Sequence, residues 1–383
     1  MSAISHLECP QCLKVYSAER LATFCICGSP LLAKYNLGPV IDAIECNEFP
    51  TEVNSMWRYS MLLPVNSPSF VTSLGEGWSP LVLTRRFGTH IGLKMLRIKD
   101  ESRNPTLSFK DRGICCAISK NLELGATAFA LPSAGNAAVS ASAYSAAAGV
   151  PVNIFMPEDT PKMFFDDCHL YGALTVSTSG TLSDSASTMK KQNGNWMDLS
   201  TTKEPYRVEG KKTLAFEIVE QLGWTIPDVI VCPTGGGTAI IGIWKGLDEL
   251  EGIGLIGSER PRLYAAQSEG CAPVVRAYET GADSIEPWKN SSTQAYGLRV
   301  PKPFADRLIM GALKQSGGGA VAVAEHEIPH IMSLAGKLEG LDVCPETAVG
   351  LAGLGNLVES GQIDGDEEVV ILNTASGVKY RAY

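Results

Sequence analysis

The stretch Val229-Ile-Val-Cys-Pro-Thr-Gly-Gly-Gly-Thr238 joins a short apolar run to a longer amphipathic one. Val229–Cys232 has the composition of a strand buried on both faces, and Thr238–Leu250 repeats its apolar residues at helical spacing. Three glycines between them let the backbone fold around an anion, and the dipole of the following helix favours a phosphate dianion. The stretch is not a Walker motif, because no Lys-Ser/Thr follows. It predicts a strand, a phosphate-binding loop and a helix, with a plain glycine turn as the alternative.

The same alternation of strands and helices extends over most of the chain, which predicts an α/β fold with a mostly parallel sheet covered on both faces. The expected strands are Leu93–Lys99, Ala126–Pro132, Val152–Met156, Leu174–Val176, Val229–Cys232, Leu263–Gln267 and Val369–Leu372. The expected helices are Met56–Leu63, Arg112–Leu122, Ala137–Ala148, Pro161–Tyr171, Leu182–Lys191, Lys212–Leu222, Thr238–Leu250, Ile328–Glu339 and Thr347–Ser360.

Composition excludes several classes of protein. The chain has 383 residues, of which 45% are hydrophobic and 19% charged, so it can form a sizeable core and is not disordered as a whole. The net charge of -9 and the lack of a basic block argue against a nucleic-acid surface. No apolar run is long enough to span a membrane, and no signal peptide is recognisable. The odd count of 11 cysteines indicates reduced thiols, as expected of a cytoplasmic protein.

Two cysteine pairs distinguish the first 35 residues from the rest of the chain. Cys9-Pro-Gln-Cys12 is followed, after 12 residues, by Cys25-Ile-Cys27. Two pairs on tight turns are what a tetrahedral zinc site with four sulfur ligands requires, so Cys9, Cys12, Cys25 and Cys27 are the expected ligands. The alternative is a vestigial ribbon that keeps its fold without metal. A redox pair is disfavoured, because no βαβ pattern surrounds Cys9 and Cys12.

Three further segments each place reactive or polar groups at a turn. Asn104-Pro-Thr-Leu-Ser-Phe-Lys110-Asp-Arg-Gly113 puts a lysine at the start of a helix, where its amine can have a fixed position and a lowered pKa. Pro132-Ser-Ala-Gly-Asn136 lies between a strand and a helix, where backbone N–H groups can bind a carboxylate. Leu372-Asn-Thr374-Ala-Ser376 offers neutral hydroxyls beyond the last strand. Taken singly, these are also compatible with a surface lysine, an asparagine turn and a capped turn.

Together the four segments suit one ligand that carries an aldehyde, a phenolate oxygen, a phosphate and a ring nitrogen, which is pyridoxal 5'-phosphate (PLP). The chain resembles the fold-type II PLP enzymes, which are similar to the β subunit of tryptophan synthase, and among them the threonine synthases with an N-terminal cysteine ribbon. Leu74-Gly-Glu-Gly-Trp-Ser-Pro-Leu81 and Asn104–Gly113 match loops of that family. The segment Glu204-Pro-Tyr-Arg-Val-Glu-Gly-Lys-Lys-Thr213 is more specific to threonine synthases.

The resemblance assigns roles to individual residues. Lys110 is expected to bind the cofactor covalently and to move protons, Asn136 to contact the phenolate oxygen, and Thr374 to face the ring nitrogen, with Ser376 as second candidate. The residues expected at the cofactor phosphate are Thr234, Gly235, Gly236, Gly237 and Thr238. The residues expected at the substrate are Ser108, Ser133, Ala134, Gly135 and Arg207, of which Arg207 would pair with the substrate phosphate. Glu346 is expected near the cofactor or simply as an acid at a helix start.

The implied reaction converts O-phospho-L-homoserine and water into L-threonine and phosphate. Ala134, Ala137 and the pair Thr201-Thr202 depart from the usual family pattern, and the hydroxyl and amide groups lost there would remove hydrogen-bond donors to the substrate. The alternative is a related β-elimination or β-replacement enzyme, similar to cysteate synthase, that acts on phosphoserine, O-acetylserine, serine or threonine. A catalytically silent relative is disfavoured, because Lys110, Asn136 and the glycine loop are all present.

The expected organisation has two open parallel-sheet domains and a small ribbon. Residues 1–50 would form the ribbon and a linker, and residues 51–383 the catalytic region, with a mobile smaller subdomain at about 115–210. The resemblance also implies a homodimer.

Overall fold

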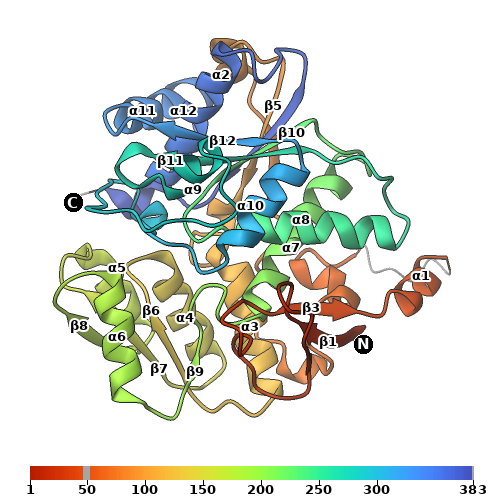
Figure 1. The fold of residues 1–383 in the computed structure, drawn as a ribbon, viewed down its shortest axis with the longest axis vertical. Coiled ribbons are helices and arrows are strands. Elements are labelled where there is room, and N and C mark those ends of the chain that lie inside the picture. Colours follow the sequence, from red (N-terminus) through yellow and green to blue (C-terminus); the bar gives the residue numbers. More distant parts are fainter. Residues whose placement is uncertain (46–51, 382–383) are drawn as a thin grey trace. The chain divides into compact units, whose positions relative to one another are not determined.

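The computed structural model describes residues 1–45 and 52–381 (Figure 1). The chain divides into two compact units. Unit 1 comprises Met1–Trp78 and Asn104–Thr213, and unit 2 comprises Ser79–Arg103 and Leu214–Tyr383. The expected boundary between residues 50 and 51 lies outside the described residues. The ribbon and the segment of the lysine motif therefore belong to the same unit.

Unit 2 contains a six-stranded sheet. Its strands, in spatial order, are β12 (Gly319–Val323), β11 (Arg262–Ser268), β10 (Val229–Pro233), β13 (Glu368–Asn373), β5 (Met95–Asp100) and β4 (Leu81–Leu83). Every pairing is parallel except that of β4 with β5. The central strands are continuous apolar runs, because strands of a parallel sheet are covered by helices and buried on both faces. As a result, β10 is buried along its whole length, directly before the glycine loop.

Seven helices belong wholly to unit 2 or enter it within the described residues: α2 (Arg85–Ile91), α7 (Tyr206–Gln221), α8 (Thr238–Gly252), α9 (Pro273–Glu279), α10 (Asp306–Gln315), α11 (Glu327–Glu339) and α12 (Pro345–Glu359). Helix α12 packs on β10 to β13, while α9 and α10 pack on β11 and β12. The short 3₁₀ helices are η3 (Glu101–Arg103), η4 (Glu269–Cys271), η5 (Tyr296–Leu298) and η6 (Gly377–Tyr380).

Unit 1 contains a four-stranded parallel sheet and a three-stranded antiparallel one. The parallel strands are β8 (Leu174–Thr178), β7 (Val152–Pro157), β6 (Phe129–Pro132) and β9 (Met197–Asp198), and the antiparallel strands are β2 (Val15–Ser17), β1 (Ile4–Glu8) and β3 (Leu32–Tyr35). The helices are α1 (Gly38–Glu45), α3 (Lys110–Glu123), α4 (Asn136–Ala147), α5 (Lys162–Leu170), α6 (Leu182–Gln192), η1 (Met56–Leu62) and η2 (Pro68–Phe70).

The expected alternation of strands and helices and the mostly parallel sheets are confirmed. Most of the expected helices begin within two residues of their predicted start, and α7 shows the largest difference. Helix α3 begins at Lys110 itself, and α7 begins at Tyr206 instead of Lys212. The first turns of α7 carry charged residues that look exposed in the sequence, yet Glu209 and Lys212 are fully buried and paired with each other. Tertiary partners therefore extend this helix beyond its apolar part.

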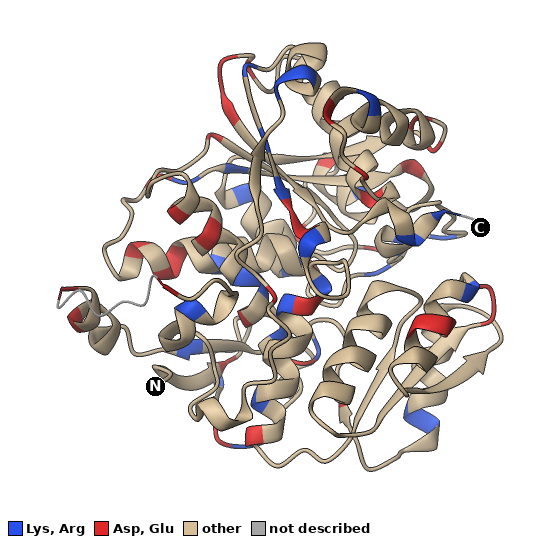
Figure 2. Ribbon diagram, turned by 180° about the vertical axis from the view of Figure 1, so that it is seen from behind, with Lys and Arg blue, Asp and Glu red and all other residues tan. Residues whose placement is uncertain are grey.

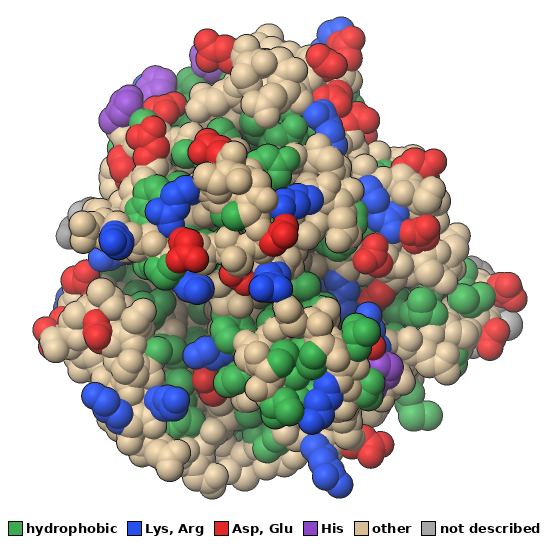
Figure 3. Space-filling view, in the orientation of Figure 1, with side chains coloured by type: hydrophobic (Ala, Val, Ile, Leu, Met, Phe, Trp, Pro, Cys, Tyr) green, Lys and Arg blue, Asp and Glu red, His purple; other side chains and the backbone are tan. Residues whose placement is uncertain are grey.

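Charged side chains of both signs are interspersed along the elements in Figure 2 and over the face of the molecule in Figure 3. Among the residues that the structure describes, no helix is long and apolar enough to cross a membrane.

Candidate active site

Lys110 is the first residue of α3, and the loop before it is fixed by buried hydrogen bonds. The carboxylate of Asp111 accepts from the backbone N–H of Thr106 at 2.7 Å and from its hydroxyl at 2.5 Å. The hydroxyl of Ser108, which is fully buried, accepts from the backbone N–H of Lys110 at 3.2 Å. These bonds hold the backbone on both sides of Lys110, so its side chain starts from a defined position.

Two ammonium groups lie close to the ring of Phe109. Lys110 Nζ is 4.5 Å from the ring centroid, and Nζ of Lys211, on α7, is 3.8 Å from it. Aromatic rings attract cations, and the attraction is stronger away from water. Because Lys211 is buried, this ring joins the beginnings of α3 and α7 next to the expected catalytic lysine.

The asparagine loop follows β6 directly. The backbone N–H of Ser133 donates to the carbonyl of Phe155 at 3.0 Å, and α4 begins at Asn136. Gly135 occupies the N-cap without a side-chain hydrogen bond. Gly135 has no side chain that could cap the start of α4, which favours an anionic group there, although the N–H of Ala138 already donates to the carbonyl of Gly135 at 2.9 Å. Ala134 and Gly135 are half-buried parts of this loop.

Arg207 is buried in the first turn of α7, and only part of its guanidinium is used by the protein. Nη1 donates to the carbonyl of Leu199 at 2.7 Å and to the hydroxyl of Thr201 at 3.1 Å. Within the described residues, neither Nε nor Nη2 has a hydrogen-bond partner. Burial lowers the pKa of Arg207 to about 10, against the opposing effect of Glu204, so the group stays charged at neutral pH. A fixed, charged guanidinium with free donors is suited to a phosphate.

The carboxylate of Glu204 holds the backbone of Arg207 in place. Its Oε2 accepts from the backbone N–H of Arg207 at 2.8 Å, and its Oε1 accepts from Asn121 Nδ2 at 2.9 Å. Burial raises the pKa of Glu204 to about 7, although Asn121 and the backbone N–H groups of Tyr206 and Arg207 act in the opposite direction. Thr201 and Glu204 thus orient Arg207, and of these the sequence singled out only Thr201, as a departure from the family.

The glycine loop belongs to unit 2, where it connects β10 to α8. A Cβ atom on Gly235 would lie 2.5 Å from the carbonyl oxygen of Gly297, and one on Gly237 would lie 2.2 Å from Ile309 Cδ1. Gly237 also has φ of +76° and is the N-cap of α8, with no side-chain cap. Only glycine fits this path, and it leaves the N–H groups of the first turn of α8 for a ligand. The loop therefore fits the phosphate of PLP. Thr234 and Thr238, at its two ends, are buried.

Thr374 lies just beyond β13 in a buried polar cluster of unit 2. Its N–H donates to the hydroxyl of Thr347 at 3.0 Å, and its Oγ1 is 3.4 Å from Cys344 Sγ. The hydroxyl of Ser376 accepts from the backbone N–H of Val378 at 3.3 Å and so caps η6. Of the two residues expected to face the ring nitrogen, Ser376 therefore already has a structural role as a helix cap.

Glu346 is also in unit 2, in the first turn of α12. Its Oε1 accepts from the backbone N–H of Gly297 at 2.8 Å and from Tyr380 Oη at 3.0 Å, whereas its buried Oε2 has no partner among the described residues. Because Gly297 also touches Gly235, this carboxylate lies one residue away from the glycine loop. A buried oxygen without a partner fits a site that a polar ligand completes.

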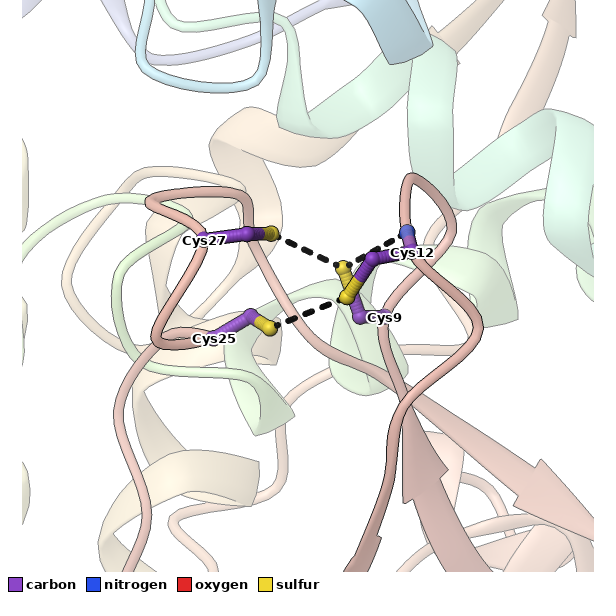
Figure 4. Close-up of side chains that lie close together, drawn as sticks. All are labelled: Cys9, Cys12, Cys25 and Cys27. Atoms are coloured by element: carbon purple, nitrogen blue, oxygen red, sulfur yellow. Dashed lines mark hydrogen bonds between the residues drawn. The ribbon is translucent and has the colours of Figure 1, made fainter.

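The four N-terminal cysteines come together as expected (Figure 4). Their sulfur atoms all lie within 4.8 Å of one another, with Cys9–Cys27 and Cys12–Cys25 each at 3.5 Å. Zinc–sulfur bonds of ~2.3 Å in a tetrahedron require sulfur–sulfur distances of about 3.8 Å, so the cluster could hold a metal ion. Tyr16 Oη donates to Cys25 Sγ at 3.2 Å. Burial acts to raise the pKa of Cys25, but hydrogen bonds from the backbone of Cys27 and from Tyr16 outweigh it and bring the pKa to about 6.

One central residue of unit 1 was not identified from the sequence, namely Glu76 in the matched loop Leu74–Leu81. Its buried carboxylate accepts five hydrogen bonds within the described part of the chain. Oε1 accepts from Trp57 Nε1 at 2.7 Å, Ser73 Oγ at 3.0 Å and Cys115 Sγ at 3.2 Å. Oε2 accepts from the backbone N–H of Leu74 at 2.9 Å and from Tyr144 Oη at 2.6 Å. Cys115 is on the lysine helix α3, and Tyr144 is on the asparagine helix α4. A lone acid in a glycine-containing loop gives no sequence signal for such a role.

The expected residues fall into two sets. Lys110, Asn136, Ser133 and Arg207 belong to unit 1, whereas the glycine loop, Thr374 and Ser376 belong to unit 2. Within unit 1 the structure brings α3 and the beginning of α7 into contact. A Cβ atom on Gly113 would lie 2.7 Å from the carbonyl oxygen of Arg207. The lysine and the arginine are therefore carried by helices that touch.

Comparison with known proteins agrees with these features. Residues 72–375 match the family described as pyridoxal-phosphate dependent enzyme. The threonine synthase of Methanocaldococcus jannaschii is 35% identical over 374 residues, which cover 97% of this chain and 92% of that protein. That of Methanosarcina acetivorans is 34% identical over 377 residues, covering 98% and 92%. That of Bacillus sp. is 34% identical over 324 residues, covering 84% and 89%.

Solved structures of lower identity establish the fold. Diaminopropionate ammonia lyase from Escherichia coli superposes with a TM-score of 0.68 at 20% identity, covering 82% of this chain and 91% of that one. Maize serine racemase gives a TM-score of 0.66 at 20% identity, covering 78% and 88%. The expected fold type II is thereby confirmed, while the PLP cofactor is confirmed by the family match over residues 72–375. The chain belongs to the pyridoxal-phosphate dependent enzymes and, among them, to the threonine synthase family.

Proposed function

We propose that this protein is an enzyme that converts O-phospho-L-homoserine and water into L-threonine and phosphate with the help of PLP. The kinship with threonine synthases over nearly the whole chain supports this reaction. The structural observation that carries it is Arg207, a buried guanidinium with free donors on a helix that touches the lysine helix. It suits a substrate that carries a phosphate in addition to an amino-acid group.

When bound, PLP supplies an electron sink that stabilises negative charge at the substrate's α carbon. Among the chain's own residues, Lys110 would hold the cofactor covalently and, once the substrate amine has replaced it, accept the α proton at Nζ. Asn136 would donate to the phenolate oxygen. The N–H groups of residues 235–238 would bind the cofactor phosphate, and Thr374, in preference to Ser376, would present a neutral hydroxyl to the ring nitrogen.

On the substrate side, Ser133 and the N–H groups of Ala134 and Gly135 would bind the carboxylate. Arg207 would bind the phosphate that leaves from Cγ. The protons removed from Cα and Cβ are replaced by protons added at Cα and Cγ, while water gives its hydroxyl to Cβ and its other proton to the leaving phosphate. Ser108 holds the backbone of Lys110 and would therefore position the lysine instead of contacting the substrate.

The test supplies the PLP-loaded protein with O-phospho-L-homoserine and, in parallel, with O-phospho-L-serine. Released phosphate and the amino-acid product are both measured. Equal amounts of phosphate and threonine from phosphohomoserine alone support the proposal, and Lys110→Ala should then abolish turnover. Turnover of phosphoserine without formation of threonine would overturn the substrate and favour the cysteate-synthase-like alternative.

We further propose that Cys9, Cys12, Cys25 and Cys27 bind one structural zinc ion. Support comes from the sulfur–sulfur distances, which suit tetrahedral coordination. Metal analysis of protein purified without chelator should give one zinc per chain, falling to zero in the double variant Cys25→Ser/Cys27→Ser. Full-length protein that contains less than about one-tenth of an equivalent of metal, even after incubation with zinc, would instead indicate a vestigial ribbon.

Three further expectations remain proposals. The segment at about 115–210 would move when substrate binds. It contains a sheet with a small core of its own around Ala130, Phe155 and Met189, which supports independent motion.

The chain would form a homodimer, which light scattering in solution tests. It would act in the cytoplasm, in keeping with the absence of disulfides among the ten cysteines that the structure describes.

A further inference from the structure

The cysteine ribbon and the arginine helix share a buried polar cluster within unit 1. Tyr35, the last residue of β3, donates from Oη to Glu209 Oε2 at 2.9 Å. Lys212 Nζ donates to the same oxygen at 2.6 Å and lies 3.7 Å from the centroid of the Tyr35 ring. The side chains of Glu209 and Lys212 are both 0% exposed. Each of the three groups therefore contacts the other two, with the ion pair fully buried and Tyr35 half-buried.

Glu209 and Arg207 are carried by the same rigid helical segment. Arg207 is the second residue of α7, and Glu209 follows two residues later. On another side, Gly210 packs tightly on α3, where its Cβ position lies 1.9 Å from the carbonyl oxygen of Arg112. Since the main-chain hydrogen bonds of a helix resist local distortion, a displacement at Glu209 moves the backbone of Arg207 as well.

The other end of the cluster leads to the cysteines through β1 and β3. These strands pair in antiparallel register from Ile4 opposite Tyr35 to Glu8 opposite Leu32, and Cys9 follows Glu8 directly. At about 3.4 Å per residue, the cysteine end lies roughly 10–14 Å along the strands from Tyr35. A metal ion that fixes the cysteine turns would thus fix the strand that carries Tyr35.

From these contacts we propose that Tyr35 and Glu209 are positioning residues that couple the cysteine ribbon to Arg207, so that metal in the ribbon strengthens binding of the substrate phosphate. The inference rests on the proposed role of Arg207. The physical reason is that loss of the Tyr35 hydroxyl leaves the buried carboxylate of Glu209 with one donor fewer and frees the start of α7 from the ribbon.

The experiment measures binding of inorganic phosphate to the PLP-loaded protein by calorimetry, together with KM and kcat for O-phospho-L-homoserine. Tyr35→Phe should weaken phosphate binding and raise KM by about 5- to 10-fold, with kcat changed less than about twofold. The near-violet absorption of bound PLP should not change. The matched control is Tyr278→Phe, which removes a hydroxyl that donates to the carbonyl of Gly318 at 2.6 Å in unit 2. It should leave phosphate binding unchanged.

Removal of metal by a chelator provides the second arm. Phosphate binding of the unmodified protein should weaken by a factor similar to that of Tyr35→Phe, whereas the variant should show little further loss, because its ribbon is already uncoupled. Equal losses in both proteins, or unchanged phosphate affinity in Tyr35→Phe, would overturn the proposal. If Tyr35→Phe unfolds, Glu209→Gln keeps the volume of the side chain and should give the same KM effect.

A separate variant distinguishes failure of this inference from failure of the proposed function. Arg207→Ala should weaken phosphate binding more than Tyr35→Phe does. If Arg207→Ala has no effect, the assignment of Arg207 is wrong. If only Arg207→Ala has an effect, the assignment stands and the coupling to the ribbon is wrong.

Discussion

Gly210 of α7 lies directly against Arg112 of α3, so closely that a Cβ atom on Gly210 would be 1.9 Å from the carbonyl oxygen of Arg112. Arg112 adds a hydrogen bond across the same crossing, from Nη1 to the hydroxyl of Thr213 at 3.0 Å. The crossing sets the distance between the helix that begins with Lys110 and the helix whose first turn carries Arg207.

Gly210→Ala should therefore force these two helices apart. We expect a loss of about 3 kcal/mol of unfolding free energy, because the atom in the way belongs to the backbone and cannot rotate aside. In the folded fraction, KM for the phosphorylated substrate should rise. Chemical denaturation and steady-state kinetics measure the two effects. Gly311→Ala is the control, since its nearest neighbour would be Gln315 Nε2 at 3.7 Å and the change should be neutral or stabilising by up to about 1 kcal/mol. Equal stability of the two variants would contradict the prediction.

Glu76→Gln should be strongly destabilising for its size. The new amide can be oriented in two ways. Its NH₂ group then faces either the indole N–H of Trp57, at the position of Oε1, or the backbone N–H of Leu74, at the position of Oε2. Neither of these N–H groups can rotate away. We expect a loss of about 2–3 kcal/mol, as for a buried donor left without an acceptor. Tyr144→Phe, which removes only one of the hydrogen bonds, should cost about 1 kcal/mol. Denaturant titrations of both variants provide the measurement, and a smaller loss for Glu76→Gln than for Tyr144→Phe would be the opposite result.

The buried Glu204 should make stability fall as pH rises. Burial raises its pKa from 4.5 to about 7, so the folded chain holds the proton more tightly than the unfolded chain does. This contribution is fully present below pH 4.5 and is lost as pH rises to about 7, with a total of about 3 kcal/mol. Glu204→Gln cannot ionise, so its stability relative to the unmodified protein should increase across this range.

Denaturation curves at several pH values between 4.5 and 7.5 would show the effect, and Glu359→Gln, at an exposed position, serves as control. A constant difference in stability between Glu204→Gln and the unmodified protein over this range would mean that Glu204 ionises normally in the fold.

Gly237→Ala should weaken the binding of PLP. The new methyl group would lie 2.2 Å from Ile309 Cδ1, at a backbone position with φ of +76°. Gly254→Ala is a close control, because Gly254 has φ of +77° and nothing within 4 Å of its Cβ position. Both variants should bear a strain of about 1–2 kcal/mol, but only Gly237→Ala should raise the dissociation constant of PLP, by at least about tenfold. The near-violet absorbance during titration with PLP measures it, and equal affinities would contradict a phosphate-binding role for this loop.

Much of the fold and of the candidate site of this protein could be predicted from short segments of the sequence. One example is the strand Val229–Cys232, which is followed directly by the glycine loop and by the helix from Thr238. Because these elements are consecutive in the chain, neighbouring residues determine both their structure and the expected phosphate-binding role of the loop. The lysine at the start of α3 and the four cysteines on two turns are predictable for the same reason.

Other features depend on residues far apart in the chain, and only the tertiary structure decided them. Tyr35 and Glu209 are separated by 174 positions, and their contact turns charged residues that look exposed into a buried cluster. The same partners explain why α7 begins at Tyr206, six residues before its apolar pattern predicts. Glu76 likewise gathers donors from η1, α3 and α4. Burial of a charge is favourable only when its partners are supplied, and no single segment of the sequence contains them all.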